Sequence, residues 1–276
     1  MNFSVLLSLY FKENPIALDQ SFQSIWKDQI MKPSEIVLVL DGSIGDELNQ
    51  YVEKWKQIIG ASLKVVPLSR NVGLGNALNE GMKHCSNEWV FRMDTDDIST
   101  PDRFEKQMLF IKSNPEIVLF GGQVLEFDYE PNDSNVLKAV PTGNQEIKLF
   151  AQKRCPFNHM TVAYKKSIIL ELGGYQHHLF MEDYNLWLRV IGAGYKVANL
   201  ADVVLYARVG NGMHARRKGL EYIKSEKQLL NLKKDLKLQN PLYANMLFLI
   251  RSMFRLMPSA LLAKIYNTFL RKKVSR

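Results

Sequence analysis

The sequence predicts an α/β protein with a mostly parallel central sheet, helices on both of its faces and a helical C-terminal appendage. Short apolar, β-leaning segments alternate with segments of helical apolar spacing through about residue 115, a pattern typical of parallel sheets. The 276-residue chain has 46% hydrophobic and 23% charged residues, which is ordinary for a folded protein. Its length fits one large domain with an appendage or two small domains.

Four strand–helix repeats are expected before residue 115. The first two strands, residues 3–10 and 35–40, flank a stretch with helical spacing. The apolar positions of that stretch are Leu18, Phe22, Ile25 and Trp26. The next elements are a helix at 46–59, a strand at 63–68, a helix at 73–85, a strand at 88–93 and a helix at 102–111. The glycines in GLGNALNEG match no phosphate-binding motif and indicate tight packing.

The pattern changes after residue 116. Residues 117–127 and 160–166 are apolar and β-leaning, and a polar excursion at 128–146 separates them, which favours antiparallel additions or a flap. The segment 180–195 then predicts a buried helix that ends near Gly192 and Gly194. Residues 196–209 follow as extended structure.

Polar residues follow each of the first four strands. In open α/β sheets the ligand binds outside the carboxyl ends of the strands, where loops and helix N-termini converge. We therefore expect these residues to form one site. They are Tyr10 and Glu13 after the first strand, Asp41, Gly42 and Ser43 after the second, Ser69, Arg70 and Asn71 after the third, and Asp94, Asp96 and Asp97 after the fourth.

The carboxylates in FRMDTDDISTPDRFEKQ indicate a metal site. Asp94 and Asp96 are two residues apart in an extended segment, so their side chains point the same way. Mg²⁺ and Mn²⁺ take one or two protein carboxylates and complete their shell with phosphate and water, which implies a diphosphate partner. Alternatively, the acidic and hydroxyl residues from Asp97 to Asp102 cap the helix that follows. An EF-hand loop is excluded because Ile98 stands near its glycine position, and an aspartate nucleophile lacks a basic partner nearby.

The formal net charge of +8 is concentrated at the C-terminus. No acidic residue follows Asp235, whereas eight of the 36 basic residues do, and residues 1–235 carry 28 basic and 28 acidic side chains. A basic surface for nucleic acid over the rest of the chain is therefore not indicated. Cys85 and Cys155 form neither a metal-ligand spacing nor a disulfide framework, which favours a reducing compartment. The apolar N-terminus is too short and lacks the basic flank of a signal peptide.

The C-terminal tail contains two amphipathic helical stretches within residues 242–270, separated by Pro258 and Ser259. Neither reaches the ~20 apolar residues that span a bilayer. The tail therefore either lies on an anionic membrane surface or packs as helices against the rest of the chain. The apolar face of the first stretch is Leu242, Met246, Leu249, Ile250, Met253 and Met257, and that of the second is Leu261, Leu262, Ile265 and Phe269. The cations expected to face the headgroups are Arg251, Arg255, Lys264 and Arg271 to Lys273.

The order and spacing of several segments resemble those of family 2 glycosyltransferases of the GT-A fold. The segments are SVLLSLYFKENPIALDQSFQSIWKDQ, EIVLVLDGS, RNVGLGNALNEGMKHC, FRMDTDDISTPDRFEKQ, GGYQHHLFMEDYNLWLRVIGAGYKV and LYARVGNGMHARRKG. They cover roughly residues 3–218, and the resemblance is strongest to bacterial enzymes that build O-antigen or exopolysaccharide units. It implies a catalytic domain at 1–218, with a nucleotide-sugar half at about 1–115 and an acceptor half at about 116–218, followed by the tail at 219–276.

The resemblance also implies a role for each matching residue. Asp41 would contact the nucleotide base, and Arg70 and Asn71 would lie along the base and ribose. Asp94 and Asp96 would bind the ribose and the metal diphosphate. The acidic pair, Glu182 and Asp183, would lie on the acceptor side, with Asp183 as the catalytic base; alternatively, the two carboxylates only favour the start of a helix through its dipole.

Three further assignments are open. His159, next to Asn158, resembles the acceptor loop of the family, but a lone histidine is as often structural. His214 would complete the shell of Mn²⁺ or Mg²⁺, although YARVGN departs from the usual tyrosine-arginine-x-histidine spelling. Arg216 and Arg217 would either bind the diphosphate or remain solvated on the surface.

The function expected from these observations is an inverting, metal-dependent glycosyltransferase. It would move a hexose or N-acetylhexosamine from a nucleoside diphosphate sugar, with UDP favoured, to an undecaprenyl-diphosphate-linked glycan at the inner face of the bacterial cytoplasmic membrane. A sugar nucleotidyltransferase is the first alternative, but SLYFKENP lacks the glycines expected after its first strand. A non-catalytic sugar-nucleotide-binding module is the second, and it would not need the full set of acidic residues.

Overall fold

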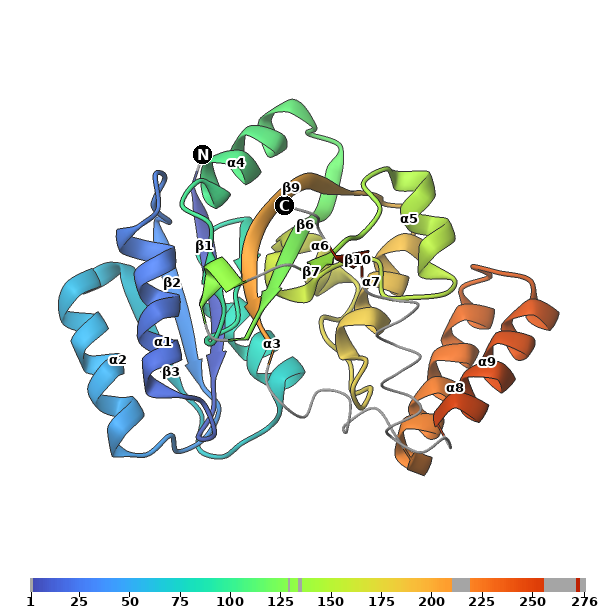
Figure 1. Cartoon of the computed structure of the whole chain (residues 1–276), viewed down its shortest axis with the longest axis horizontal. Coiled ribbons are helices and arrows are strands. Elements are labelled where there is room, and N and C mark those ends of the chain that lie inside the picture. The colour runs from blue at the N-terminus through green and yellow to red at the C-terminus, as the bar shows by residue number, and fades with distance from the viewer. Residues whose placement is uncertain (1, 129, 134–135, 210–218, 256–271, 274–276) are drawn as a thin grey trace.

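The central feature of the structure is one mixed β-sheet with helices on both faces (Figure 1). The structure is a computed structural model that describes residues 2–128, 130–133, 136–209, 219–255 and 272–273. Ten strands of these residues join the sheet, in the order β10-β7-β6-β8-β4-β1-β2-β3, and β9 pairs with both β5 and β6. The expected α/β class is confirmed.

The N-terminal half is the predicted parallel α/β unit. Strand β1 pairs in parallel with β2 on one side and β4 on the other, and β3 continues the sheet beyond β2. The elements are β1 (Phe3–Leu9), α1 (Pro15–Phe22), a π-helical turn (Gln23–Lys27), β2 (Glu35–Leu40), α2 (Asp46–Ile59), a 3₁₀ turn (Gly60–Ser62), β3 (Leu63–Pro67), α3 (Leu74–His84), β4 (Trp89–Arg92), β5 (Ile98–Ser99) and α4 (Arg103–Ser113).

The second half adds the expected antiparallel strands. Strand β8 runs antiparallel to both β4 and β6, and β6 runs parallel to the long strand β9. The short elements α5, α6 and β5 are not apparent in the sequence pattern. The elements are β6 (Ile117–Phe127), a 3₁₀ turn (Pro131–Asp133), β7 (Val136–Lys138), α5 (Asn144–Ala151), a 3₁₀ turn (His159–Thr161), β8 (Ala163–Lys165), α6 (Lys166–Glu171), α7 (Glu182–Gly192) and β9 (Lys196–Arg208).

The sheet is buried on both faces, as its apolar strands require. Along β1, Val5 and Leu7 point into the cluster shared with α1, α2 and α4, whereas Leu6 points into the cluster shared with α3 and α5 to α8. This alternation follows from the two-residue period of a strand. The carboxyl ends of β1, β2, β3 and β4 consequently meet at one edge of a rigid platform.

The C-terminal appendage begins as part of the second core cluster. Helix α8 (Gly219–Asp235) contributes Tyr222 and Leu229 to the cluster that contains α7, and α9 (Pro241–Arg255) packs beside α8. Strand β10 (Lys272–Lys273) pairs with β7 at the edge of the sheet. No helix in the described part of the chain combines the length and apolar character needed to cross a bilayer.

The glycine-rich helix α3 packs closely against the sheet, as the sequence predicted. A Cβ atom at Gly81 would lie 2.4 Å from Leu6 Cδ1 and 2.7 Å from Val39 Cγ2. Both neighbours are fully buried strand residues. Only a residue without a side chain allows the backbone of α3 to approach β1 and β2 this closely.

We predict that Gly81→Ala lowers the free energy of unfolding by about 1–3 kcal/mol, because the added methyl group overpacks the core. Gly143→Ala is the control, since its Cβ would meet only Glu146, at 3.6 Å, and it should cost less than about 1 kcal/mol. Urea denaturation of both variants measures the difference. Equal stability of the two variants would contradict the tight contact as the reason for glycine at 81.

Candidate active site

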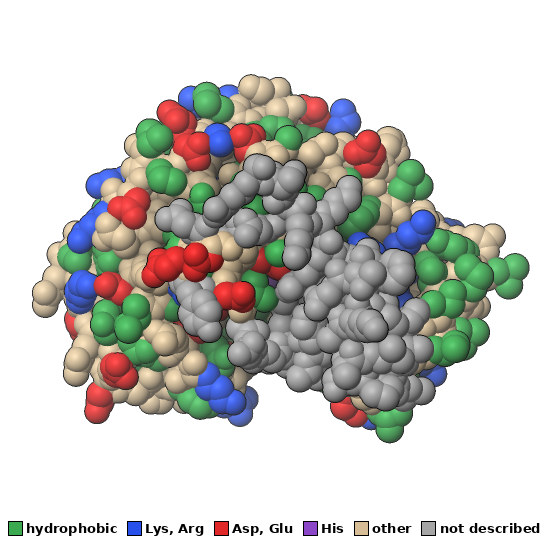
Figure 2. Space-filling view, viewed as in Figure 1, with side chains coloured by type: hydrophobic (Ala, Val, Ile, Leu, Met, Phe, Trp, Pro, Cys, Tyr) green, Lys and Arg blue, Asp and Glu red, His purple; other side chains and the backbone are tan. Residues whose placement is uncertain are grey.

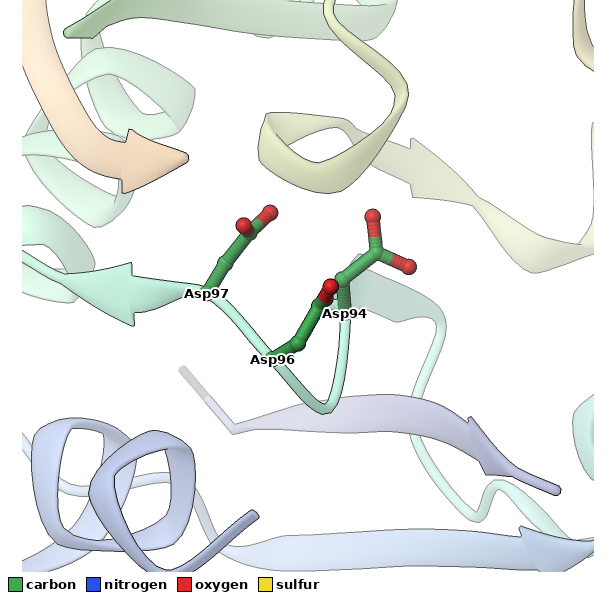
Figure 3. Close-up of side chains that lie close together, drawn as sticks. All are labelled: Asp94, Asp96 and Asp97. Atoms are coloured by element: carbon green, nitrogen blue, oxygen red, sulfur yellow. The ribbon is translucent and has the colours of Figure 1, made fainter. Parts of the chain in front are cut away.

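Three aspartates gather in the loop that joins β4 to β5. One carboxylate oxygen from each of Asp94, Asp96 and Asp97 lies within 4.8 Å of the other two, and the side chains rise from the same side of the loop (Figure 3). We call these residues the aspartate triad. They do not cap the following helix, because α4 begins only at Arg103 and its N-cap residue is Asp102, which makes no side-chain capping hydrogen bond. Of the residues in the helix-cap alternative, only Asp102 is thus at the cap.

Neighbouring elements hold the triad loop in place. Ser21 Oγ donates to Asp94 O at 3.0 Å, and Thr95 Oγ1 donates to Glu13 Oε2 at 2.9 Å. The backbone N–H of Arg208 donates to Asp97 Oδ1 at 2.9 Å, and Arg208 Nε donates to Asp96 O at 3.2 Å.

Burial and repulsion between carboxylates raise the pKa values of Asp96, Asp97 and the neighbouring Glu13. Desolvation, then Asp94 and Glu13, raise the pKa of Asp96 to about 7. Desolvation, then Asp94 and Asp96, raise the pKa of Asp97 well above its usual value. Burial also raises the pKa of Glu13. Carboxylates that repel one another at close range favour a divalent cation among them, and the oxygen donors of the triad are of the type that such a cation takes.

A buried arginine lies beside the triad. Arg92, the last residue of β4, is 1% exposed, and its Nη2 forms an ion pair with Asp94 Oδ1. Although burial opposes a charge on the guanidinium, Asp94 raises the pKa of Arg92. Its positive charge opposes, without cancelling, the rise that burial causes in the pKa values of Asp96, Glu182 and Asp183. The guanidinium contacts the triad directly, whereas its effect on the acidic pair is electrostatic.

Asp41, the predicted contact to the nucleotide base, is buried and hydrogen-bonded to a neighbouring loop. It is 3% exposed, and its two carboxylate oxygens accept hydrogen bonds from the N–H groups of Val72 (2.7 Å) and Gly73 (3.1 Å). Asp41 thus fixes the loop that leads into α3, where Arg70 and Asn71 are exposed. The structure brings the three predicted nucleotide-binding residues together, but it directs the Asp41 carboxylate toward the loop.

The acidic pair forms the first two residues of α7, on the other side of α3. Gly75 permits this approach, because a Cβ there would lie 3.2 Å from Tyr175 Cβ and 3.6 Å from Glu182 Cβ and Cγ. Burial raises the pKa values of both Glu182 and Asp183. A carboxylate with a raised pKa is a stronger base.

Two contacts orient Asp183. Its Oδ1 accepts from Tyr184 N at 2.7 Å, and the Cys155 thiol donates to its Oδ2 at 3.6 Å. Burial, then Asp183, raise the pKa of Cys155 well above its usual value, so the thiol remains a donor. The position of Asp183 is therefore consistent with both expectations, that it is the catalytic base and that it only favours the start of a helix.

His159 lies in an aromatic environment next to this pair. Its Nε2 forms a 2.8 Å hydrogen bond with Tyr175 OH, and its ring contacts Trp187. Burial, then Arg92, hold the pKa of His159 well below its usual value, so the ring is neutral. Asn158 is 1% exposed, and its amide donates to Gly122 O and Lys138 O. The histidine is thus a satisfied residue that lies close to the site.

The remaining predicted residues, His214, Arg216 and Arg217, lie outside the described residues. The sequence also left Arg92, Tyr175 and Cys155 without roles. A signal was present for Arg92, because a charged residue in the otherwise apolar segment WVFR requires a buried partner. The contacts of Tyr175 and Cys155 depend on tertiary packing and have no local signal.

An α/β sheet covered by helices on both faces, with three clustered aspartates after its fourth strand, is the arrangement expected of a transferase of the GT-A fold. The comparisons with known proteins identify the family. Residues 4–172 match the family described as Glycosyl transferase family 2, and the chain belongs to this family. It is thus a glycosyltransferase, as the sequence predicted.

Several relatives are similar over most of their length. An uncharacterized glycosyltransferase of Haemophilus influenzae is 50% identical over 99% of this chain and 100% of its own. The amylovoran biosynthesis glycosyltransferase AmsE of Erwinia amylovora is 46% identical over 96% of this chain and 98% of its own. The UDP-Gal:alpha-D-GlcNAc-diphosphoundecaprenol beta-1,3-galactosyltransferase of Escherichia coli is 36% identical over 81% and 80%.

Solved structures agree on the fold. The crystal structure of S. aureus TarS 1-349 superposes with a TM-score of 0.67 at 18% identity, covering 98% of this chain and 73% of that one. The mannosyltransferase PcManGT of Pyrobaculum calidifontis gives a TM-score of 0.65 at 18% identity, covering 97% and 75%. At this identity the likeness concerns the fold alone.

We predict that the metal-free protein loses stability as the pH rises from about 5 to about 8. The pKa of Asp96 is about 7 in the folded state, far above that of an unfolded aspartate. Its contribution to stability is therefore full below about pH 4 and is lost as the pH rises through about 7. Saturating Mn²⁺ should raise Tm more at pH 8 than at pH 5, because the cation binds the ionised form.

Thermal unfolding of wild type and Asp96→Asn, with EDTA or Mn²⁺, checks this prediction. The asparagine variant should show a flatter pH dependence in EDTA and a smaller response to Mn²⁺. Parallel pH curves for the two proteins would contradict the raised pKa of Asp96.

Proposed function

We propose that this chain is an inverting, metal-dependent glycosyltransferase that uses a nucleoside diphosphate sugar and a lipid-linked acceptor. The observation that carries the proposal is the aspartate triad, three carboxylates close enough to share a divalent cation, together with the acidic pair, in which burial raises the pKa of Asp183. One carboxylate set would bind the leaving diphosphate through the metal, and the other would receive a proton. A transfer with inversion needs these two functions.

In the proposed reaction, an acceptor hydroxyl oxygen attacks the anomeric carbon of the donor sugar. The bond from that carbon to the diphosphate oxygen breaks, and the hydroxyl proton moves to Asp183. A bound Mg²⁺ or Mn²⁺ supplies charge stabilisation to the departing diphosphate. Arg92 holds the Asp94 carboxylate in position through their ion pair, and the raised pKa of Asp183 makes its carboxylate a better proton acceptor at neutral pH.

A UDP-sugar is the favoured donor, carrying a hexose or an N-acetylhexosamine. The name of the E. coli relative specifies UDP-Gal, and TarS has been crystallised with UDP-GlcNAc. The exposed Arg70 and Asn71, on the loop held by Asp41, are the proposed contacts to the nucleotide, and Asp94 is the proposed contact to the ribose. His214, Arg216 and Arg217 remain proposals for the metal and the diphosphate.

The proposed acceptor is a glycan linked through diphosphate to undecaprenol, in O-antigen or exopolysaccharide synthesis. The E. coli relative is named for such an acceptor, and AmsE is named for the exopolysaccharide amylovoran. The acidic pair, with His159 beside it, is the proposed acceptor side of the site. An acceptor of this kind is embedded in a membrane.

The described part of the tail presents an apolar face that suits a membrane. We call this face, on α9, the α9 stripe, and Figure 2 shows it as an apolar patch at the right of the molecule. It consists of Leu242, Met246, Leu249, Ile250 and Met253, between 43% and 80% exposed. We propose that it contacts the inner face of the cytoplasmic membrane. Arg251 does not join the expected headgroup contacts, because it forms a 3.0 Å ion pair with the buried Glu226.

The alternatives have less support. Family membership and the lack of glycine in SLYFKENP argue against a sugar nucleotidyltransferase. A non-catalytic module would gain nothing from the raised pKa of Asp183. Release of free UDP that depends on the acceptor would separate transfer from both alternatives.

We predict that Asp183→Asn lowers kcat by about 10²- to 10⁴-fold, the usual contribution of a positioned base, and leaves the Kd for UDP with Mn²⁺ unchanged. Asp96→Asn should impair both quantities, because it removes a metal ligand. Acceptor-dependent UDP release and calorimetry measure the two effects. If Asp183→Asn kept a kcat within about threefold of wild type, the base assignment would be wrong.

We predict that Leu249→Glu reduces binding to vesicles of anionic lipid at least about tenfold. Burial of a leucine contributes about 1.5–3 kcal/mol, and the introduced carboxylate is repelled by the headgroups. Leu149→Glu on α5 is the matched control, because Leu149 is 65% exposed and Leu249 is 63% exposed. Co-sedimentation of the two variants tests the surface, and equal losses would rule out the α9 stripe as the membrane contact.

A further inference from the structure

The residue before the N-cap of α7 has an unusual backbone conformation. Phe180 has φ +66°, in the left-handed region that bulky L-residues rarely adopt. Its side chain is 46% exposed, so burial in the core does not explain the conformation. Strained residues persist where surrounding contacts enforce them, and they concentrate at functional sites. Phe180 lies two residues before Glu182 and three before Asp183.

The enforcing contacts come from α8. Ser225 Oγ donates to Leu179 O at 2.5 Å, and the Phe180 ring stacks on Tyr222 with centroids 5.5 Å apart and planes at 18°. Ser225 is 3% exposed and Tyr222 is 7% exposed. Two successive residues of the segment are thus fixed to one buried face of α8.

Two further contacts extend this attachment toward the start of the segment. Gln228 Nε2 donates to His177 O at 3.0 Å, and His178 Nε2 forms a 2.9 Å hydrogen bond with Ser225 O. Every residue from His177 to Phe180 therefore contacts α8. We call residues 177–180 the α8-held segment.

The other side of the segment connects directly to the first turn of α7. Met181 N donates to His178 O at 2.9 Å, and Asn185 Nδ2 forms a 3.1 Å hydrogen bond with His178 Nδ1. The turn bounded by these contacts carries the acidic pair. A displacement of the α8-held segment would therefore move Asp183.

We propose that Tyr222 and Ser225 of α8 are positioning residues for the Glu182–Asp183 pair, acting through the left-handed conformation of Phe180. The proposal rests on the proposed function of Asp183 as the base. Because misplacement of a catalytic group by about 1 Å can cost about 10² in rate, loss of this attachment lowers turnover and leaves the nucleotide side intact. All four contacts between α8 and the α8-held segment join residues that lie beyond residue 172, where the match to the family model ends.

The first experiment compares Phe180→Ala with Phe180→Gly. Both remove the ring that stacks on Tyr222, but glycine adopts positive φ without strain and alanine does not. We expect kcat to fall about 10- to 100-fold in Phe180→Ala and less in Phe180→Gly, with an unchanged Kd for UDP with Mn²⁺ in both. Leu220→Ala, an exposed position on α8, is the control and should keep the wild-type kcat.

Turnover is measured as acceptor-dependent UDP release. The donor is the UDP-sugar that raises Tm most in the presence of Mn²⁺, and the acceptor is GlcNAc-diphosphoundecaprenol. A raised acceptor KM with unchanged kcat would instead make Phe180 a contact of the acceptor and overturn the proposal. Equal kcat values for the alanine and glycine variants would also overturn it.

The second experiment measures the attachment without catalysis. Amide hydrogen exchange in residues 182–185 should be faster in Ser225→Ala and Tyr222→Leu than in wild type, and near wild type in Ser225→Thr and Tyr222→Phe, which keep the hydroxyl donor and the ring. Unchanged exchange in all variants would overturn the proposal even if Asp183 is the base. Faster exchange with a wild-type kcat would show that the attachment does not affect catalysis and would overturn the positioning role. Wild-type activity of Asp183→Asn would overturn both the assignment of Asp183 as the base and the proposal that rests on it.

Discussion

The ion pair between Arg92 and Asp94 allows several carboxylates to gather at one edge of the sheet. Buried acidic groups that face one another repel and bind protons, as the raised pKa values of Glu13, Asp96 and Asp97 show. A buried guanidinium at the end of β4 opposes this repulsion. One guanidinium offsets only part of the repulsion among these carboxylates, which suits the divalent cation proposed for this site. In that proposal, the cation of the substrate complex relieves the remaining charge imbalance.

The rest of the fold serves to keep this edge rigid. The carboxyl ends of β1 to β4 meet there because these strands pair in parallel, and helices bury both faces of the sheet. Gly81 and Gly75 bring α3 close to the sheet and to α7, and Asp41 fixes the loop before α3. These contacts position α3 and the loop before it against the sheet and against the start of α7.

Much of this could be predicted from the sequence, because its signals are local. The helix over 46–59 matches α2 (Asp46–Ile59). Asp94 and Asp96 lie close together after β4, as expected, although a bent loop and not an extended strand positions them and also brings Asp97 beside them. The acidic pair was located at the start of a helix, as in the structure. These features depend on periodicity and on the spacing of neighbouring residues.

The features that were missed depend on long-range contacts. The short elements α5 and α6 have too few residues to show a period. The hydrogen bonds that the Asp41 carboxylate accepts from the N–H groups of Val72 and Gly73, about thirty positions away, have no local signal in the sequence, and the expected contact of Asp41 with the nucleotide stays a prediction. Arg251 looked like a surface cation until α8 supplied Glu226 as its partner. The apolar pattern of a segment predicts which of its faces is buried, but it does not predict which other helix or strand packs against that face.

Helix α8 has apolar side chains in the same cluster as α7, and on its other side it carries α9. The acidic pair and the α9 stripe are thus connected through a single helix. One way to redirect such an enzyme to another lipid carrier would be a chimera that exchanges the C-terminal regions of two relatives. Such a chimera must exchange the buried face of α8 together with the face of α7 that packs against it. A junction placed at residue 218 would divide one packing unit between two parents.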